Sequence, residues 1–325
     1  MPEDLAQRVL ARERRALAKA ITLLESQNAA HQSQARALLD TLLPHSGNSL
    51  RIGISGVPGA GKSTFIETFG LTLISAGHRV AVLAVDPSSH ATGGSILGDK
   101  TRMQRLSMHA DAFIRPSPSR GVLGGVAAHT REAMLVCEAA GFDIVLIETV
   151  GVGQSEVSVA NMTDVFVVLQ LPNAGDELQA MKKGVLELAD LIVLNKADLD
   201  VAAAERAERQ LANIIKLLRP HAHVWTPEVL RISALTGDGL DSLWSKILAC
   251  RDAMRSHGLW QEKRRRQALA WMWQIIGEDL QRRFRDHGGV RQALEIAAAN
   301  VASGHTSASA AAALLLDIFE ARDRT

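Results

Sequence analysis

One segment of the sequence has a glycine-rich pattern that is typical of phosphate binding. Residues 56–64 read GVPGAGKST, which fits G-x-x-x-x-G-K-[ST], between the apolar run RIGIS (51–55) and a helical stretch. Glycines allow backbone N–H groups to turn inward around phosphates, and the positive end of the following helix attracts them. We expect Lys62 to reach the β- and γ-phosphates and Ser63 to bind Mg²⁺. The predicted contact residues are Gly56, Val57, Pro58, Gly59, Ala60, Gly61, Lys62, Ser63 and Thr64.

A second motif predicts the base of the nucleotide. The apolar run DLIVLN (190–195) ends in Asn195-Lys196-Ala197-Asp198. A carboxylate accepts hydrogen bonds from the N1–H and exocyclic amine of guanine, whereas adenine presents an acceptor at N1. An unpaired buried polar group costs ~1–3 kcal/mol, so Asp198 favours GTP over ATP by about one to two powers of ten. Lys196 is expected to lie across the plane of the base.

A third loop strengthens the guanine prediction. Ser233, Ala234 and Leu235 stand at the end of the apolar run VLRIS (229–233). This S-A-x pattern matches a loop whose backbone supports the O6 atom of guanine. The tripeptide alone would be weak evidence, but its position after the two earlier motifs in the chain supports the guanine prediction.

Carboxylates that follow two other apolar runs are the predicted metal ligands. Asp86 follows RVAVLAV (79–85), and Glu148 ends FDIVLIE (142–148). Carboxylates at the ends of strands beside a phosphate loop are placed to hold Mg²⁺, directly or through water. Asp99, in the glycine-rich stretch after Asp86, is a third candidate. The predicted metal set is therefore Ser63, Asp86, Asp99 and Glu148.

The group that positions the attacking water stays open. The D-x-x-G-Q pattern of Ras-like GTPases is absent, because the acid is Glu148 and Val152 follows Gly151. Asp99, Gln154 or a partner protein could supply the missing function. An arginine supplied by a partner accelerates such reactions by about 10³–10⁵-fold, and arginines of this chain near the site are Arg102, Arg105, Arg115 and Arg120. We therefore predict slow intrinsic turnover.

Short apolar runs alternate with helical stretches through the middle of the chain. Besides those already named, DVFVVLQ occupies 164–170. Near-continuous apolar runs separated by helices are typical of parallel strands that are buried on both faces. The predicted fold class is α/β, with a doubly wound, mostly parallel sheet. Ligands of such sheets bind beyond the carboxyl ends of the strands, where all the motifs above fall.

Helical patterns flank this region on both sides. Residues 3–25 and 29–43 have apolar residues at helical spacing, and 255–285 is predicted to be one long helix before shorter ones at 289–301 and 306–321. The expected segments are an N-terminal helical part (1–48), the nucleotide-binding domain (49–253) and a C-terminal helical arm (254–325). The arm is a candidate dimerisation element. Its basic run, 263–266, is interpreted as a solvated part of that arm rather than a nucleic-acid surface.

Composition narrows the class of protein. The 325 residues include 36 Lys and Arg against 35 Asp and Glu, a balance that argues against general attraction to nucleic acid or anionic membranes. No apolar run approaches the ~20 residues of a membrane-spanning helix. The N-terminus lacks a signal-peptide pattern, and Cys137 and Cys250 form no C-x-x-C pair. A cytoplasmic location is expected.

Several longer motifs together resemble the MeaB/ArgK family of P-loop GTPases. They are GVPGAGKST, VDPSS (85–89), GDKTRM (98–103), ETVGVGQSE (148–156), PNAGDELQAMKKG (172–184) and NKAD. The resemblance covers nearly the whole chain. It implies a homodimer joined through the C-terminal arm. It also implies a chaperone that binds adenosylcobalamin-dependent methylmalonyl-CoA mutase and gates cofactor loading or protects the mutase from inactivation.

The resemblance also assigns roles to individual residues. Asp86, Asp99 and Glu148 match the family's Mg²⁺-shell and catalytic acids. Residues 172–184 match a third switch that contacts nucleotide and partner, with Lys182 or Lys183 implicated in partner-stimulated hydrolysis. The predicted catalytic residues are Lys62, Asp99, Glu148, Gln154 and Lys183.

Two other functions compete with this one. A metallochaperone GTPase for nickel enzymes would need a His/Cys cluster, and the eleven histidines are scattered, with His221 and His223 the closest pair. A transport-linked kinase would need a substrate pocket and would normally prefer ATP, which the NKAD motif argues against.

Overall fold

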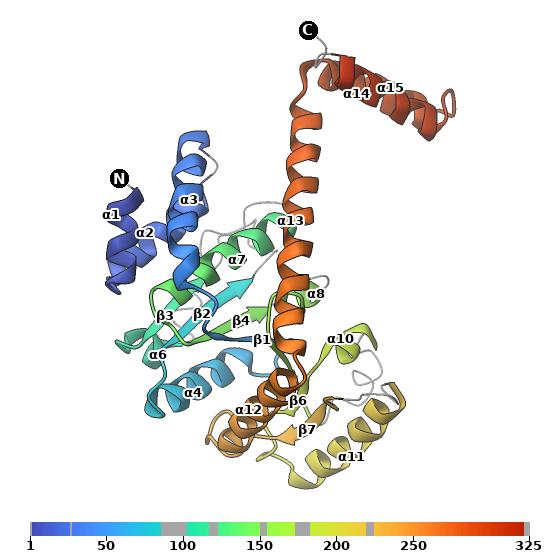
Figure 1. Ribbon diagram of the computed structural model, residues 1–325. Helices are drawn as coiled ribbons and strands as arrows, with labels where there is room; N and C mark the ends of the chain where they lie inside the picture. The colour runs from blue at the N-terminus through green and yellow to red at the C-terminus, as the bar shows by residue number, and fades with distance from the viewer. Residues whose placement is uncertain are drawn as a thin grey trace. The chain divides into compact units, whose positions relative to one another are not determined.

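Seven parallel strands form one sheet in the order β3-β2-β4-β1-β5-β6-β7 (Figure 1). The computed structural model describes residues 2–26, 28–85, 103–116, 123–149, 155–172, 183–218 and 224–321. The strands are β1 (Leu50–Gly56), β2 (Val80–Val85), β3 (Ala112–Pro116), β4 (Ile144–Thr149), β5 (Val165–Gln170), β6 (Leu191–Leu194) and β7 (Glu228–Arg231). The expected α/β fold with a parallel sheet is confirmed.

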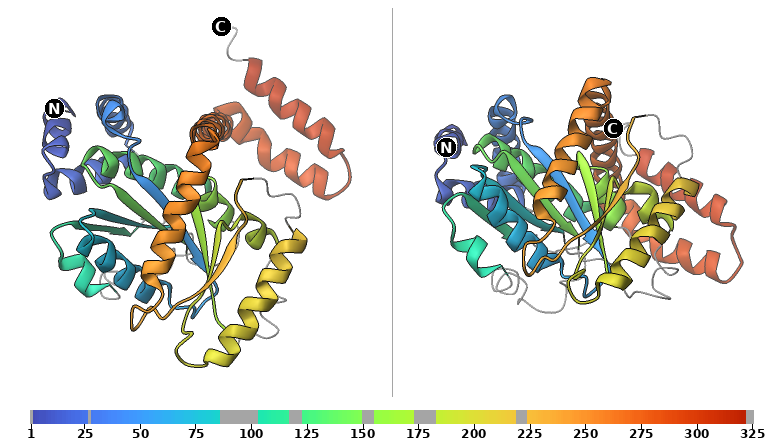
Figure 2. Two further views of the ribbon diagram at one scale, coloured as in Figure 1. Left: turned by 60° about the horizontal axis from the view of Figure 1, so that its bottom comes forward. Right: turned by 90° about the horizontal axis from the view of Figure 1, so that it is seen from below.

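Helices cover both faces of the sheet (Figure 2). One face packs against α7 (Leu123–Ala139), α8 (Ser155–Ala160), α10 (Lys183–Leu188) and α11 (Val201–Leu218). Behind α7 lie the N-terminal helices α1 (Pro2–Leu10), α2 (Arg14–Leu24) and α3 (Ala29–Leu42), with the short 3₁₀ helix η1 (Leu43–His45) leading into β1. The other face packs against α4 (Lys62–Ser75), α6 (Gln104–Met108) and α12 (Leu240–Ser256).

Alternating side chains of each strand feed two separate hydrophobic cores. In β4, Val145 and Ile147 belong to the core on the α7 side, whereas Ile144 and Leu146 belong to the core on the α4 side. A strand with two buried faces must be apolar at almost every position. This requirement explains the continuous apolar runs in the sequence.

A glycine allows α8 to approach the sheet closely. A Cβ atom on Gly53 of β1 would lie 2.7 Å from the Phe166 ring, 2.8 Å from Thr163 Oγ1 and 2.9 Å from Val159. All three neighbours belong to α8, β5 and the turn between them. A larger residue at position 53 would push this layer away from the sheet.

The structure differs from the sequence expectation in three elements. Strand β3 was not among the predicted strands, because its five residues include Arg115 and Pro116 and it lies at the sheet edge. The helix expected over 3–25 is two helices, since Arg12 adopts a left-handed φ of 65° between α1 and α2. The helix expected over 255–285 begins at Leu259, because Gly258, with φ 70°, separates α12 from α13 (Leu259–Asp286).

The chain forms two compact units, 1–267 and 268–325. The second contains the end of α13 and the hairpin of α14 (Gly288–Ala302) and α15 (Ala308–Glu320). Its small core consists of Val290, Ala297, Ala311 and Leu315, beside an edge-to-face contact of Phe284 with Phe319 at 5.5 Å. The three-segment division expected from the sequence stays a prediction.

The start of α13 is fixed within the first unit by a buried ionic network. Arg264 donates to both carboxylate oxygens of Asp164, at 2.7 and 2.6 Å, and to the carbonyls of Gly47 and Ser49. The Asp164 side chain is 1% exposed and that of Arg264 13% exposed. Lys263 donates to the Asp164 carbonyl at 2.7 Å. Half of the basic run is therefore an internal anchor, which corrects the expectation of a solvated run.

A second buried pair lies beside this anchor. Arg51 of β1 donates to both oxygens of Glu138 in α7, at 2.7 and 2.9 Å. Burial by itself would raise the pKa of Glu138, but hydrogen bonds from Arg51, Ser49 and the Gly47 N–H hold it below its ordinary value. The segment between η1 and β1 is thus held from two sides, by Glu138 and by Arg264.

We predict that Arg264→Met destabilises the protein by ~3–5 kcal/mol, because it leaves the Asp164 carboxylate buried without its partner. The matched control is Arg266→Met in the same basic run, whose ion pair with Glu262 is exposed (69% and 48%). Exposed pairs contribute only ~0–1 kcal/mol. Guanidinium unfolding followed by tryptophan fluorescence measures both changes. Equal losses of unfolding free energy in the two variants would contradict the role of Arg264 as an anchor.

Candidate functional site

The glycine-rich loop joins the carboxyl end of β1 to the first turn of α4, as expected. Gly59 and Gly61 adopt left-handed φ angles of 79° and 83°. A Cβ atom on Gly61 would lie 2.7 Å from Asn195 Nδ2, and one on Gly56 would lie 2.4 Å from the Leu169 carbonyl oxygen. Side chains at these positions would clash with the end of β5 and with the predicted base-reading motif. The loop therefore needs its glycines both for backbone direction and for space.

Lys62 folds back over this loop. Its Nζ atom donates to the carbonyls of Gly56 at 2.8 Å and Val57 at 3.2 Å. Partial burial lowers the pKa of Lys62, and the negative charges of Glu148 and Glu156 oppose that shift. Charged acceptors form stronger hydrogen bonds with an ammonium than neutral carbonyls do, so this position of Lys62 is compatible with the predicted phosphate contact.

Asn195, at the end of β6, connects the phosphate loop to the predicted base-reading loop. Its side chain is almost fully buried. The Nδ2 atom donates to the Ala60 carbonyl at 2.7 Å, and Oδ1 accepts from the Ala234 N–H at 2.9 Å. One amide thus satisfies both of its polar ends with backbone groups of two separate loops.

The remainder of the NKAD motif turns away from the strand. Lys196 adopts a φ of 61°, which is uncommon for a residue with a side chain, and Ala197 N–H donates to the Ile232 carbonyl at 3.0 Å. Asp198 is exposed at the carboxyl edge of the sheet. Residues other than glycine that adopt a left-handed backbone conformation are concentrated at binding sites, where the surrounding structure stabilises that conformation.

The loop that begins with Ser233 is a compact turn. Ser233 N–H donates to the Asp238 carbonyl at 3.0 Å, and Gly237 N–H donates to the Ser233 carbonyl at 2.9 Å. Ala234 is buried, whereas Leu235 at the tip is 80% exposed. The structure therefore brings 56–64, 195–198 and 233–235 to one end of the sheet.

Of the three predicted acidic metal ligands, Glu148 is among the described residues. Glu148 lies in β4, beside Ile54 of β1 and Ala84 of β2 in the strand register. The neighbouring Thr149 donates to Ser55 Oγ at 2.9 Å and so ties β4 to β1 below the phosphate loop. Asp86, Asp99, Gln154 and Lys182 lie outside the described residues, and of Lys183 only the backbone, at the start of α10, is described.

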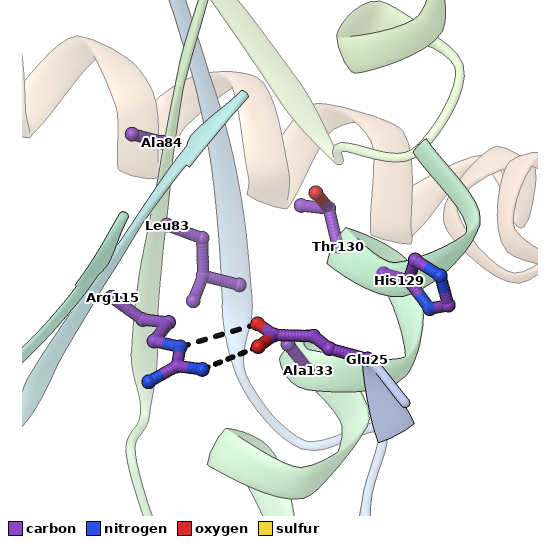
Figure 3. Close-up of a pocket in the computed structure, with 7 residues that line it drawn as sticks. All are labelled: Glu25, Leu83, Ala84, Arg115, His129, Thr130 and Ala133. Carbon is purple, nitrogen blue, oxygen red and sulfur yellow. Dashed lines mark hydrogen bonds and ion pairs between the residues drawn. The ribbon is translucent and has the colours of Figure 1, made fainter. Parts of the chain in front are cut away.

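Arg115, one of the arginines near the site in sequence, has a partner. It pairs with Glu25 at the end of α2 through Nε, at 3.2 Å, and through Nη2, and Nη2 also reaches Thr22 Oγ1. Figure 3 shows this pair in a small pocket. The lining residues, none of which belongs to the predicted nucleotide site, are Glu25, Leu83, Ala84, Arg115, His129, Thr130 and Ala133. Arg105 is exposed, and Arg102 and Arg120 lie outside the described residues.

Sequence reasoning missed one contact of this site. Thr68, in the middle of α4, donates from Oγ1 to the Ala234 carbonyl at 2.7 Å. No local pattern could have revealed it, because a threonine on a helix ordinarily bonds within its own helix.

The described residues contain neither a metal-binding cluster nor a membrane-spanning helix. No three His, Cys, Asp or Glu side chains in that part of the chain gather closely enough to hold a metal ion. No helix within the same ranges is both long and apolar enough to cross a membrane.

Comparisons with known proteins agree on one family. The profile described as "Methylmalonyl Co-A mutase-associated GTPase MeaB" matches residues 17–288. A putative GTPase of Caulobacter vibrioides is 56% identical over 98% of this chain and 97% of its own length. The mouse "Methylmalonic aciduria type A homolog, mitochondrial" is 46% identical over 95% of this chain and 77% of its own.

A solved structure agrees with the fold. The crystal structure of a LAO/AO transport system kinase has a TM-score of 0.78 and 36% sequence identity, and the match covers 98% of this chain and 97% of that one. The likeness therefore extends over both compact units of the chain, not only over the sheet.

We predict that Asp198→Asn raises the Kd for GDP by about 10- to 100-fold, since the amide keeps one acceptor oxygen but replaces the other with an NH₂ donor, which then opposes a donor of guanine. The Kd for ADP should not rise, because adenine presents an acceptor at N1 rather than a donor. Fluorescence competition with both nucleotides measures the two constants. Asp200→Asn is the matched control, because the Asp200 carboxylate accepts from Ala203 N–H in the first turn of α11. Undiminished preference of Asp198→Asn for GDP would show that another group reads the base.

Proposed function

Since this chain belongs to the MeaB family of methylmalonyl-CoA mutase-associated GTPases, we propose that it is a GTP-hydrolysing chaperone of such a mutase. In this proposal it binds adenosylcobalamin-dependent methylmalonyl-CoA mutase and gates cofactor loading or protects the mutase from inactivation. The observation that supports nucleotide binding most directly is the Asn195 amide, which bonds to both the predicted phosphate loop and the predicted base-reading loop.

The first proposed step is capture of the nucleotide. Phosphates displace the Gly56 and Val57 carbonyls from Lys62 Nζ and exchange a neutral partner for a charged one. The N–H groups at the start of α4 add the favourable end of the helix dipole. At the other end of the site, Asp198 accepts the two donors of guanine while the loop 233–235 presents a backbone N–H to O6.

The donor set of the site fits Mg²⁺. Ser63 stands in the first turn of α4, and the charge of Glu148 acts on the adjacent Lys62. A hydroxyl and a carboxylate at one edge are the hard oxygen ligands that this ion prefers. We propose Ser63, Asp86, Asp99 and Glu148 as its direct or water-mediated partners. When bound, Mg²⁺ would neutralise charge that develops on the phosphates.

The proposed switch has two states. With GTP, the loops that contain Asp86, Asp99 and Gly151 contact the γ-phosphate side of the site; after hydrolysis that contact is lost. Gln154, Asp99, Lys183 or the partner would position the attacking water. The mutase can respond to the change only through different affinities for the two states.

The proposed assembly is a homodimer joined through the C-terminal arm. In the second unit, large apolar side chains remain exposed: Leu269, Met272, Trp273, Ile275, Ile276, Leu280, Leu294, Ile296, Leu314 and Leu316. Trp273 is 66% exposed, whereas only four residues of that unit form its buried core. Exposed apolar surface on this scale is typical of a protein–protein interface. Nucleic acid and membrane are not proposed as partners, and a cytoplasmic location stays a prediction.

We predict slow GTP turnover by the purified protein alone and a rise of about tenfold or more with the cognate mutase. The measurement is phosphate release from GTP with and without an adenosylcobalamin-dependent methylmalonyl-CoA mutase, with ATP as the control nucleotide. Lys62→Ala provides the blank, because turnover that survives it belongs to a contaminant.

The outcomes separate the proposal from its rivals. Unchanged turnover with a verified cognate mutase would contradict the chaperone role and leave nickel delivery or another partner to be tested. Faster turnover of ATP than of GTP would favour the transport-linked kinase.

A further inference from the structure

The loop predicted to meet guanine O6 is held at one residue. Ala234 donates its N–H to Asn195 Oδ1 at 2.9 Å, and its carbonyl accepts from Thr68 Oγ1 at 2.7 Å. Other hydrogen bonds lie within the loop, from Ser233 N–H to the Asp238 carbonyl, from Gly237 N–H to the Ser233 carbonyl and from Thr236 N–H to Ser233 Oγ. The two bonds at Ala234 therefore connect the turn to Asn195 and to α4.

The bond from Thr68 also fixes the next amide along the chain. The peptide unit that contains the Ala234 carbonyl contains the Leu235 N–H, and this unit is planar and trans. The carbonyl and the N–H therefore point in opposite directions. A hydroxyl that holds the carbonyl of Ala234 toward α4 necessarily holds the Leu235 N–H away from α4. Ala234 N–H is already used by Asn195, so Leu235 N–H is the backbone donor whose direction Thr68 controls.

Thr68 behaves differently from the other hydroxyl residues of its helix. Thr72 donates to the Thr68 carbonyl at 3.0 Å and Ser75 to the Leu71 carbonyl at 2.9 Å, which are ordinary bonds within a helix. Thr68 Oγ1 also lies 3.1 Å from the Thr64 carbonyl, but the nearer acceptor is Ala234, 166 positions away in the sequence. A hydroxyl has a single proton to donate, and the shorter distance favours Ala234.

We infer that Thr68 is a positioning residue for guanine recognition. It orients the Ala234–Leu235 peptide toward O6 and, because α4 begins with Lys62, it ties the base-reading loop to the helix that binds the phosphates. The inference rests on the proposed guanine site. It adds a determinant of base specificity that lies outside the sequence motifs and acts through another residue.

The test uses three variants of the full-length protein. Thr68→Val removes the hydroxyl with little change of shape, Thr68→Ser keeps it, and Thr72→Val makes the same change one turn later, where the hydroxyl donates to the Thr68 carbonyl within α4. Each is titrated with GDP, with inosine diphosphate, which keeps O6 and N1–H but lacks the 2-amino group, and with 2-aminopurine riboside diphosphate, which lacks both O6 and N1–H.

Thr68→Val should raise the Kd by about 3- to 10-fold for both GDP and inosine diphosphate, the size of one neutral hydrogen bond. The Kd for the 2-aminopurine nucleotide should not change. Thr68→Ser should restore binding, and Thr72→Val should bind all three nucleotides as the unaltered protein does. This combination of results is expected only if the hydroxyl acts through O6, since a loss of helix structure would weaken the binding of all three nucleotides.

Two results would overturn the inference in distinguishable ways. An equal loss for all three nucleotides, or no loss for GDP, would remove the role of Thr68 and leave the guanine site intact. If the unaltered protein binds GDP and the 2-aminopurine nucleotide equally, no donor meets O6, and the proposed base site fails together with the role of Thr68.

Discussion

The buried side-chain amide of Asn195 is the interaction on which the proposed site depends. A buried amide must satisfy both its donor and its acceptor, and here the partners are Ala60 in the phosphate loop and Ala234 in the base-reading loop. A side chain at Gly61 would clash with this amide, because a Cβ atom there would lie 2.7 Å from Asn195 Nδ2. One residue that follows β6, the strand next to the sheet edge, therefore connects the predicted phosphate and base subsites.

The sheet explains why such a connection is possible. In a parallel sheet, all carboxyl ends lie at the same edge, so loops that are far apart in sequence meet there. Thr149 and Ser55 bond across β4 and β1 beneath the phosphate loop, and Thr68 bonds from α4 to the base-reading loop. The side chains that make these contacts stand on strands and a helix, which hold binding groups more accurately than loops do.

The opposite end of the sheet, at the amino ends of the strands, anchors the start of the C-terminal arm. There, Arg264 pairs with Asp164 at the start of β5, and Arg51 pairs with Glu138 at the end of α7. Together these pairs hold the segment 47–49 and the start of α13. Asp164 follows α8 by only a short turn, and α8 follows the segment that contains Gln154. The root of the C-terminal arm is therefore connected, through a buried network, to an element next to the predicted switch.

Local patterns were sufficient for the elements whose signal lies within a few residues. The strand–loop–helix around 56–64 and the strand before NKAD could be predicted, because buried parallel strands are apolar throughout and glycine-rich turns are distinctive. Strand β3 could not, because a five-residue edge strand with Arg115 and Pro116 has no such signal. Lys263 and Arg264 resembled solvated charges, since their partners are about 100 positions away. Thr68 could be recognised only from its partner in space.

The central claim is that one continuous site spans the phosphate loop and the NKAD motif. A crystal structure of the full chain with GDP and Mg²⁺ tests it most directly. The account predicts that Lys62 Nζ leaves the Gly56 and Val57 carbonyls for the phosphates, that guanine lies against Asp198, and that Asn195 still bonds to Ala60 and Ala234. A nucleotide with its phosphates outside 56–64, or with its base away from Asp198, would contradict the account.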